Sequence, residues 1–306
     1  MTVAKIIGSY IYQFVDSYSI RYLRTQPLRA FGVVVVIISI ILAVIGPFIV
    51  PYSPTKAIPG SQLLAPSVHH WFGTDVNGMD VFSRTVCAYR MDLTIAIIGI
   101  GLAVLIGFPI GIYAGYFDGK GGVSGAMSLV ILRIMDVFQA FPIFVLALVL
   151  VAALGPSVKN VILVVIITNI PSTLRLARSE ILSLRERPYA EAARASGNSD
   201  LRIALYHLMP NAMTPVLSLS SVVMGFAILL TAGLSFVGAG IRVPTPEWGS
   251  MIATGAPAII TGQWWPAVFP GVFMALTIFA FSLVGDTITV LADPLEKVRF
   301  GYVKNG

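Results

Sequence analysis

The sequence predicts an all-helical integral membrane protein with six transmembrane helices, and three observations support this fold class. Of its 306 residues 57% are apolar and 11% are charged, whereas a soluble domain carries about 25% charged residues. Apolar runs recur with the length of roughly 20 residues that a helix needs to cross a bilayer. Lysine and arginine gather in alternate connections between these runs, as they do in multi-spanning proteins.

The six predicted spans follow one another along the whole chain. They cover residues 31–50, 93–116, 126–154, 158–174, 213–236 and 268–291. The segment 250–260 is also apolar, but it is too short for a seventh span and contains Gly255 and Pro257. We expect an interfacial or re-entrant helix there.

The connections divide the chain into parts. These are a cytoplasmic N-terminal segment 1–30, a first transmembrane helix 31–50, an extracytoplasmic loop 51–90, a core of five helices 91–292 and a cytoplasmic tail 293–306. The loop 51–90 is long enough to form a small cap between the first two spans. Residues 1–30 mix basic and aromatic side chains without a cleavable signal pattern, which predicts an amphipathic segment on the inner membrane face.

The distribution of basic residues predicts the orientation. With both termini inside, fourteen lysine and arginine residues lie on the cytoplasmic side and five outside, and Arg133 lies near the start of the third span. Cytoplasmic connections carry such an excess. Because these residues are divided among membrane flanks, they form no single basic face, and a nucleic-acid partner is excluded. The single cysteine, Cys87, excludes an intramolecular disulfide.

The inner connection 175–211 predicts two short helices with a break between them. Residues 191–196 favour a helix, and Gly197 suits the position that ends one. Residues 198–200 are helix-start signals, and Pro210 predicts an end. The first helix would expose a surface of small residues at Ala192, Ala193 and Ala195 that fits a groove on another protein.

This connection resembles the EAA loop of ABC importer permeases. The resemblance rests on Glu191-Ala192-Ala193, on Gly197 after three further residues, and on the ending His207-Leu-Met-Pro210-Asn211 after nine more. It implies that the loop forms the coupling helix that docks on a nucleotide-binding subunit. The implied coupling residues are Glu191, Ala192, Ala193, Gly197, His207, Pro210 and Asn211.

Two further stretches are similar to the dipeptide, oligopeptide and nickel permeases. One runs from Trp71 to Arg84; the other combines Pro246-Glu-Trp-Gly249 with Gly285-Asp286 and Asp293-Pro294. The similarity extends over residues 25–299 and fits the second of the two permease subunit types, which implies a type I ABC importer permease fold. The departures from the family pattern leave the substrate class open; they are Met79, Ala88, Asp92 and Thr289-Val290.

The resemblance implies a permease subunit that carries dipeptides or oligopeptides, with oligosaccharides or nickel as alternative cargoes. The chain would pair with a homologous second permease, two ATP-binding subunits and an extracytoplasmic solute-binding protein in the cytoplasmic membrane of a prokaryote. It has no phosphate-binding Gly-x-x-x-x-Gly-Lys-Ser/Thr sequence. We therefore expect no enzymatic activity and no cofactor in this chain, with ATP and magnesium bound by the partner subunits.

Two other classes of protein are alternatives to the permease. A self-contained channel or secondary transporter does not need the EAA spacing. An intramembrane protease is suggested by Gly122-Val-Ser124-Gly125, but a serine nucleophile needs a nearby base. The three histidines, His69, His70 and His207, all fall in predicted loops. Adjacent histidines point in different directions on regular backbone, so we interpret His69 and His70 as loop residues rather than metal ligands.

Several residues within the spans allow two interpretations. Arg133 and Asp136 are three residues apart and can pair on one helix face; either they form a local ion pair or they belong to an inner gate. The same choice applies to Asp286. Gly107, Gly111 and Gly115 form steps of small residues that let helices approach closely, either inside the chain or at a contact with another subunit.

Overall fold

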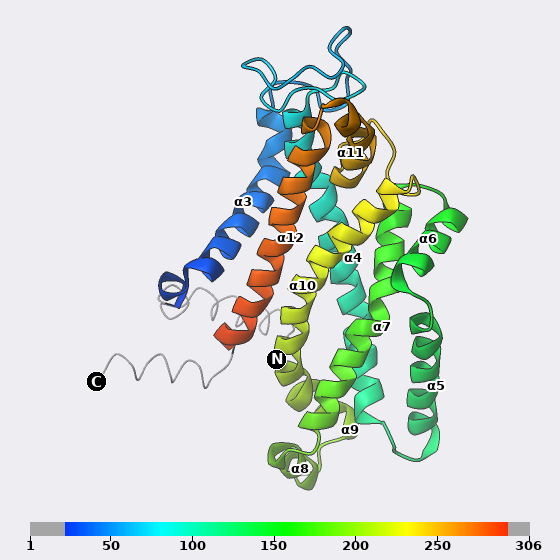
Figure 1. Cartoon of the computed structure of the whole chain (residues 1–306). Coiled ribbons are helices and arrows are strands. Elements are labelled where there is room, and N and C mark those ends of the chain that lie inside the picture. Colours follow the sequence, from blue (N-terminus) through cyan, green and yellow to red (C-terminus); the bar gives the residue numbers. More distant parts are fainter. Residues whose placement is uncertain (1–21, 293–306) are drawn as a thin grey trace.

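The chain folds as a bundle of long helices in a computed structural model that describes residues 22–292 (Figure 1). Most of the predicted segment 1–30 and all of the predicted tail 293–306 lie outside the described residues. The helices are α3 (Pro27–Ile49), α4 (Val81–Tyr116), α5 (Gly122–Gln139), α6 (Ile143–Leu154), α7 (Val158–Leu184), α8 (Pro188–Ala195), α9 (Asp200–Arg202), the π-helix η1 (Ile203–Leu208), α10 (Met209–Phe236), α11 (Trp248–Gly255), the 3₁₀-helix η2 (Ala256–Thr261) and α12 (Trp265–Ala292).

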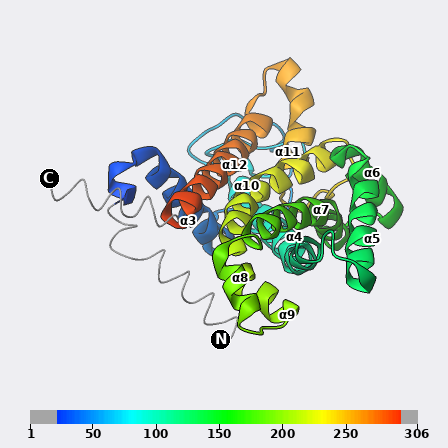
Figure 2. The ribbon, with the colours of Figure 1, turned by 90° about the horizontal axis from the view of Figure 1, so that it is seen from below.

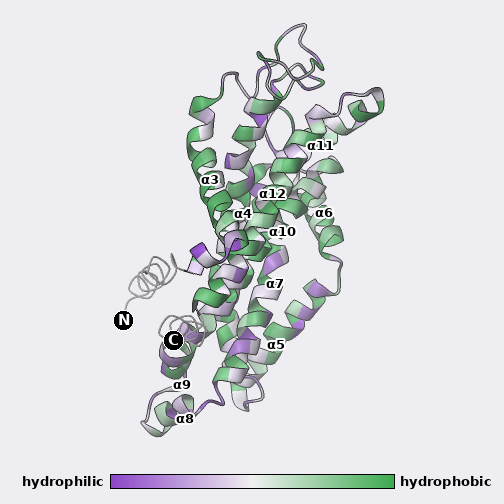
Figure 3. Cartoon of the chain, turned by 60° about the vertical axis from the view of Figure 1, so that its left-hand side comes forward, coloured by the Kyte–Doolittle hydropathy of each residue, from purple (hydrophilic) through white to green (hydrophobic). Residues whose placement is uncertain are grey.

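The predicted fold class is confirmed within residues 22–292. Six helices there are long and apolar enough to cross a membrane, and they cover Pro27–Ile49, Val81–Tyr116, Gly122–Gln139, Val158–Leu184, Asp200–Phe236 and Trp265–Leu291. Hydrophobic residues cover most of the length of these helices, whereas α8 and α9 carry many hydrophilic residues (Figure 3). The segment 250–260 forms most of α11 and most of η2, and neither helix is long enough to count as a membrane span.

The order of the helices across the bundle is clear from one end. α3 and α12 lie on one side, α5 and α6 lie on the other, and α4, α7 and α10 lie between them (Figure 2). We call the end that carries α8 and α9 the α8 end. The opposite end, which carries α11 and the loop 50–80 (the cap), is the α11 end (Figure 1).

The helix bounds correct several predicted boundaries. α4 begins at Val81, so residues 81–90 are helical and not part of an outer loop. The pattern of apolar runs did not indicate this helical segment because its polar side chains, such as Ser83 and Thr85, are buried in protein rather than exposed to lipid. α7 continues to Leu184, so the first ten residues of the predicted inner connection 175–211 are helical too.

The predicted third span, residues 126–154, is broken into two helices. α5 ends at Gln139 and α6 begins at Ile143. Pro142 explains the break, because proline lacks an N–H and disfavours the helical conformation in the residue before it. α5 alone is long enough to count as a span, and α6 is a shorter apolar helix.

The centre of the bundle is the close contact between α4 and α7. A Cβ atom at Gly111 would lie 2.5 Å from the Leu174 carbonyl oxygen, and one at Gly115 would lie 2.8 Å from the Arg178 carbonyl oxygen. Such distances leave no room for a side chain. The glycine steps of α4 therefore serve packing within the chain, which was one of the two interpretations of the sequence.

A substitution at this contact has a matched control in the same helix. Gly111→Ala places a methyl group against the backbone of α7, and overpacking typically costs about 1–3 kcal/mol. We expect a lower thermal unfolding midpoint for the purified protein. Gly101→Ala meets no atom within 4 Å and should leave the midpoint unchanged or slightly higher. Equal midpoints for the two variants would contradict the packing role of Gly111.

Candidate functional site

The helix α8 presents one face to the chain and the other to its surroundings. Ala190 and Ala193 are buried in a cluster with residues of α4, α7, η1 and α10. Glu191, Ala192 and Ala195 are exposed. The expectation that Ala193 belongs to an exposed small-residue surface is therefore wrong, because this side chain faces inward one residue after Ala192. The exposed face of α8 consists of Glu191, Ala192 and Ala195 with neighbouring polar residues.

Gly197 ends α8 as predicted. Its φ of +76° lies in the left-handed region that favours glycine. Its N–H donates to the Arg194 carbonyl at 3.0 Å, and the Asn198 N–H donates to the Ala193 carbonyl at 3.3 Å, which is the pair of hydrogen bonds of a Schellman motif. The Asn198 amide donates to the same Ala193 carbonyl at 2.9 Å. The end of α8 thus has a single defined conformation.

Polar contacts fix the α8 end to α4. The Tyr116 hydroxyl donates to Asp200 at 2.6 Å, and Lys120 lies 3.3 Å from the other oxygen of that carboxylate. Arg185 at the end of α7 donates to the carbonyls of Gly115 and Asp118, at 3.0 Å and 2.8 Å. These contacts and the apolar cluster under α8 make the loop and the ends of α4 and α7 one packed unit.

The predicted helix end at Pro210 is wrong. Pro210 is the second residue of α10, and helical structure continues from Asp200 to Phe236. Proline is tolerated in the first turn of a helix, and the π-helix η1 comes directly before it. The Asn211 amide donates to the His207 carbonyl at 3.0 Å and lies 3.5 Å from the Tyr189 hydroxyl of α8. His207 and Asn211 thus stand at the junction of α10 and α8.

The charged residues predicted within the spans have different environments. Arg133 Nη1 lies 3.7 Å from Asp136 Oδ2, as predicted. Asp136 makes a closer contact with Arg175 of α7, whose Nη2 donates to Oδ1 at 2.7 Å. This second partner, which the sequence did not indicate, links α5 to α7. Asp286 on α12 is exposed and pairs with no cation among residues 22–292.

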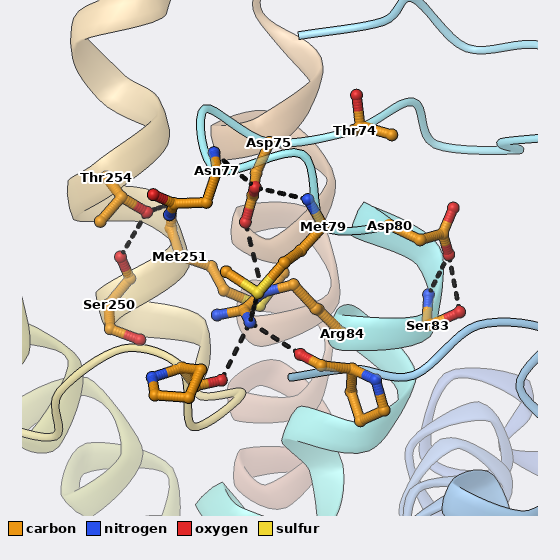
Figure 4. Close-up of polar contacts among 12 residues, drawn as sticks. Thr74, Asp75, Asn77, Met79, Asp80, Ser83, Arg84, Ser250, Met251 and Thr254 are labelled. Carbon is orange, nitrogen blue, oxygen red and sulfur yellow. Dashed lines mark hydrogen bonds and ion pairs between the residues drawn. The ribbon is translucent and has the colours of Figure 1, made fainter. Parts of the chain in front are cut away.

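At the α11 end, Arg84 of α4 joins three segments (Figure 4). Its side chain is 1% exposed, and Nη1 donates to the Pro54 carbonyl of the cap at 2.7 Å and to the Pro244 carbonyl at 3.0 Å. Asp75 lies 3.5 Å from its Nε, and the Met79 sulfur lies 3.0 Å from Nη1. The guanidinium therefore ties the cap to the loop that follows α10.

Two aspartates shape the end of the cap where it enters α4. Asp75 Oδ1 accepts the N–H groups of Asn77 and Met79, both at 2.9 Å. Asp80 caps α4 by accepting the Ser83 N–H at 2.8 Å. His70 is buried with Nδ1 2.9 Å from Asp80, whereas its neighbour His69 is exposed. The two histidines thus have separate environments in the loop.

The start of α11 is built on buried polar groups. Glu247 accepts the N–H groups of Gly249 and Ser250 at 2.8 Å and 2.6 Å. The Trp248 ring is fully buried, with its indole N–H donating to the Thr85 carbonyl at 3.1 Å. The Trp248 backbone N–H donates to Asp92 at 3.2 Å. Burial is the main cause that raises the pKa of the Glu247 carboxyl above its ordinary value.

The sequence assigned no role to Arg84 or Glu247 within the stretches that resemble the family, and it marked Asp92 only as a departure from the family pattern. One signal could have found them. A charged residue beside a run of apolar residues has to be paired or hydrogen-bonded if the run is buried, and all three are at most 1% exposed. Arg84 and Asp92 have partners far away in sequence, at Pro244 and Trp248, so these pairings need the structure, whereas Glu247 accepts from Gly249 and Ser250 close by.

A bundle of six candidate spans that carries a rigid helical loop at one end and an anchored cap at the other is the membrane component of a transporter. Residues 107–298 match the family described as binding-protein-dependent transport system inner membrane component, and residues 17–66 match the N-terminal transmembrane domain of oligopeptide transport permease C. The chain belongs to this family of inner-membrane ABC permease subunits.

Curated relatives are similar to the chain over nearly its whole length. It is 34% identical to the dipeptide transport system permease protein DppC of Alkalihalophilus pseudofirmus, over 90% of this chain and 89% of the relative. It is 35% identical to the probable D,D-dipeptide transport system permease protein DdpC of Escherichia coli K12, over 89% of each. The glutathione transport system permease protein GsiD of Escherichia coli O6:K15:H31 is 34% identical, over 90% and 89%.

The role of Arg84 can be tested by its removal. Arg84→Met leaves Asp75 without its ion-pair partner and the carbonyls of Pro54 and Pro244 without their donor, and breaking a buried ion pair costs about 3–5 kcal/mol. We expect a lower unfolding midpoint and faster proteolysis within residues 51–80. Arg84→Lys keeps the charge but not the planar fork, so it should be intermediate. The control is Arg242→Met, which alters an exposed arginine of the loop that follows α10; this variant should be cleaved at the wild-type rate.

The buried carboxyl of Glu247 predicts a pH dependence of stability. The pKa of Glu247 is higher in the folded than in the unfolded state. At a pH between these two pKa values the folded state therefore binds more protons than the unfolded state. The contribution of Glu247 to stability is fully present below the unfolded-state pKa and is lost as pH rises through the folded-state pKa. Glu247→Gln stays neutral and keeps an amide oxygen as an acceptor.

The measurement is the unfolding midpoint of both proteins across the acidic to neutral range. We expect the wild type to lose stability relative to Glu247→Gln as pH rises. Parallel profiles for the two proteins would show that Glu247 titrates alike in both states and would contradict the prediction.

Proposed function

We propose that this permease subunit imports dipeptides or short oligopeptides and that α8 is the element through which separate ATPase subunits move it. The observation that carries the proposal is the geometry of α8. Its buried face is packed on α4, α7 and α10, and its exposed face carries Glu191 and Ala192. A force applied to that face is transmitted to the bundle because the opposite face of α8 is packed directly on the long helices.

The coupling role rests on how the loop is held. α8 ends in a fixed turn at Gly197, and Asp200 anchors the following residues to Tyr116 and Lys120. At the other side, Asn211 bridges from α10 to Tyr189. Ala193 contributes by packing, and Glu191 and Ala192 contribute the contact surface. ATP and magnesium belong to the partner subunits, and closure of these subunits would swing the spans between two orientations.

The orientation that we propose places the α8 end in the cytoplasm. Arg185, Arg187, Arg194 and Arg202 all lie in or beside α8 and α9, and cytoplasmic connections carry such an excess of basic residues. The cap and α11 then face outward, where a solute-binding protein would dock. A homologous second permease would complete the pathway, and the sparsely buried α5, of which Ser128 is the buried residue, supports a contact on that side.

The peptide cargo is supported by the relatives. Their names specify dipeptides, D,D-dipeptides and glutathione, all of which contain peptide-like bonds. Uptake assays on the complete transporter in proteoliposomes should therefore include a dipeptide, an oligosaccharide and nickel. Uptake of only the oligosaccharide or only nickel would overturn the peptide assignment. Uptake by this chain alone would overturn the dependence on ATPase subunits.

The coupling role of α8 predicts a specific pattern of variants. Gly197→Val forces a β-branched residue into the left-handed region, which costs about 1–3 kcal/mol, whereas Gly197→Asn is tolerated there. Glu191→Ala removes the charge from the exposed face, and Glu186→Ala removes a nearby carboxylate that pairs with Arg185. We expect Gly197→Val and Glu191→Ala to lower ATP-driven uptake about tenfold, as loss of roughly 1.4 kcal/mol of docking energy does.

The two controls should transport at the wild-type rate, and all four variants should insert into the membrane in equal amounts. ATP-driven uptake in proteoliposomes and binding of the ATPase subunits are measured together. Unchanged uptake in both Gly197→Val and Glu191→Ala would contradict the coupling role.

A further inference from the structure

An open groove runs between α3 and α4 on the surface of the bundle. It has a volume of about 410 Å³, within the range of about 300–1,000 Å³ typical of small-molecule sites. α3 contributes Ile40, Ala43 and Phe48 to its walls, and α4 contributes Arg90, Thr94 and Ile98. Both helices are candidate membrane spans, and α3 lies at the edge of the bundle (Figure 2).

The walls of the groove are apolar and exposed along two candidate membrane spans. The side of α3 that lines it is exposed, with Ile40 at 46%, Val44 at 64% and Phe48 at 82%. Within a span, exposed aliphatic and aromatic side chains are in contact with hydrocarbon. The walls are therefore complementary to an acyl chain.

Arg90 is the one charged side chain that lines this groove. It is exposed, and it forms no ion pair with any residue of the described range 22–292. Val86, one turn earlier in α4, contacts Gly46 of α3, where an added Cβ would lie 2.8 Å from Val86 Cγ1. Arg90 is about 6 Å further along α4, and the end of α3 at Ile49 is about 4.5 Å beyond Gly46.

The depth of Arg90 follows from these positions. The base of its side chain lies about 10 Å below the end of α3, so it starts within the span. A cation at that depth extends its long side chain towards the interface and needs an anion there. The phosphate of a lipid on the α11 side of the membrane is such an anion, and a guanidinium binds phosphate through two parallel N–H donors.

We propose that the groove between α3 and α4 is a phospholipid-binding site, in which Arg90 binds the lipid phosphate and one acyl chain lies along the apolar walls. A lipid bound in this groove contacts both α3 and α4 and holds them together where the two helices leave space between them. This inference does not depend on the transported substrate or on the coupling role of α8.

The complete transporter, purified in mild detergent and supplied with phosphatidylglycerol, provides the test. Native mass spectrometry counts the lipids that remain bound. Arg90→Gln removes the charge and should retain about tenfold less lipid, because a charge-assisted bidentate contact is lost. The matched control is Arg242→Gln, which alters an exposed arginine outside the groove and should retain the wild-type amount.

A second variant tests the groove separately from the charge. Thr94 is exposed, and its hydroxyl donates to the carbonyl of its own helix at 2.6 Å, so Thr94→Phe fills the groove without removing a tertiary contact. We expect it to lose the lipid although Arg90 is present. Wild-type lipid retention in either Arg90→Gln or Thr94→Phe would overturn the proposal. A photo-cross-linker attached to Thr94→Cys should capture phospholipid, and capture of the second permease chain instead would also overturn it.

Discussion

The contact between α4 and α7 is the constraint on which the rest of the structure depends. Helices in lipid gain little from hydrophobic burial against one another, so their association relies on close packing and hydrogen bonds. Glycines at 107, 111 and 115 bring the α4 backbone against the α7 backbone over more than two turns. Both ends of the protein are then attached to α4, which makes the position of this helix decisive for the coupling loop and for the cap.

Polar contacts are made at both ends of α4, and residues 93–115 of this helix carry no charged side chain. Arg84 at one end donates hydrogen bonds to carbonyls of two loops, and the Tyr116 hydroxyl at the other end donates to Asp200. Isolated backbone carbonyls and carboxylates at such depths would be costly if they lacked donors. With 36 residues, α4 is about 54 Å long, longer than the hydrocarbon core, so both ends reach regions where polar contacts are stable.

The sequence predicted those features whose cause is local. Runs of apolar residues identified six spans, and Gly197 identified the end of α8 because a left-handed residue is needed there. It did not predict that Ala193 faces inward, since this depends on what lies beneath α8. It misplaced the start of α4 for a related reason. Hydropathy measures suitability for lipid, whereas Ser83, Arg84 and Asp92 are suited to buried partners in other segments.

Pro210 shows why a local rule can fail beside a tertiary contact. A proline within a helical pattern predicts an end because it removes one N–H and clashes with the preceding turn. Here the helix widens into the π-turns of η1, which ends at Leu208, two residues before Pro210, and such widened turns occur often at functional positions. The widening sets the rotation of residues 203–208 relative to α10. Ile203, Ala204 and Leu208 can then face the cluster that also buries Ala190 and Ala193. The position of Pro210, the π-helix and the inward face of α8 thus depend on one another. A regular α-helix over residues 203–208 would move α8 away from α4 and α7.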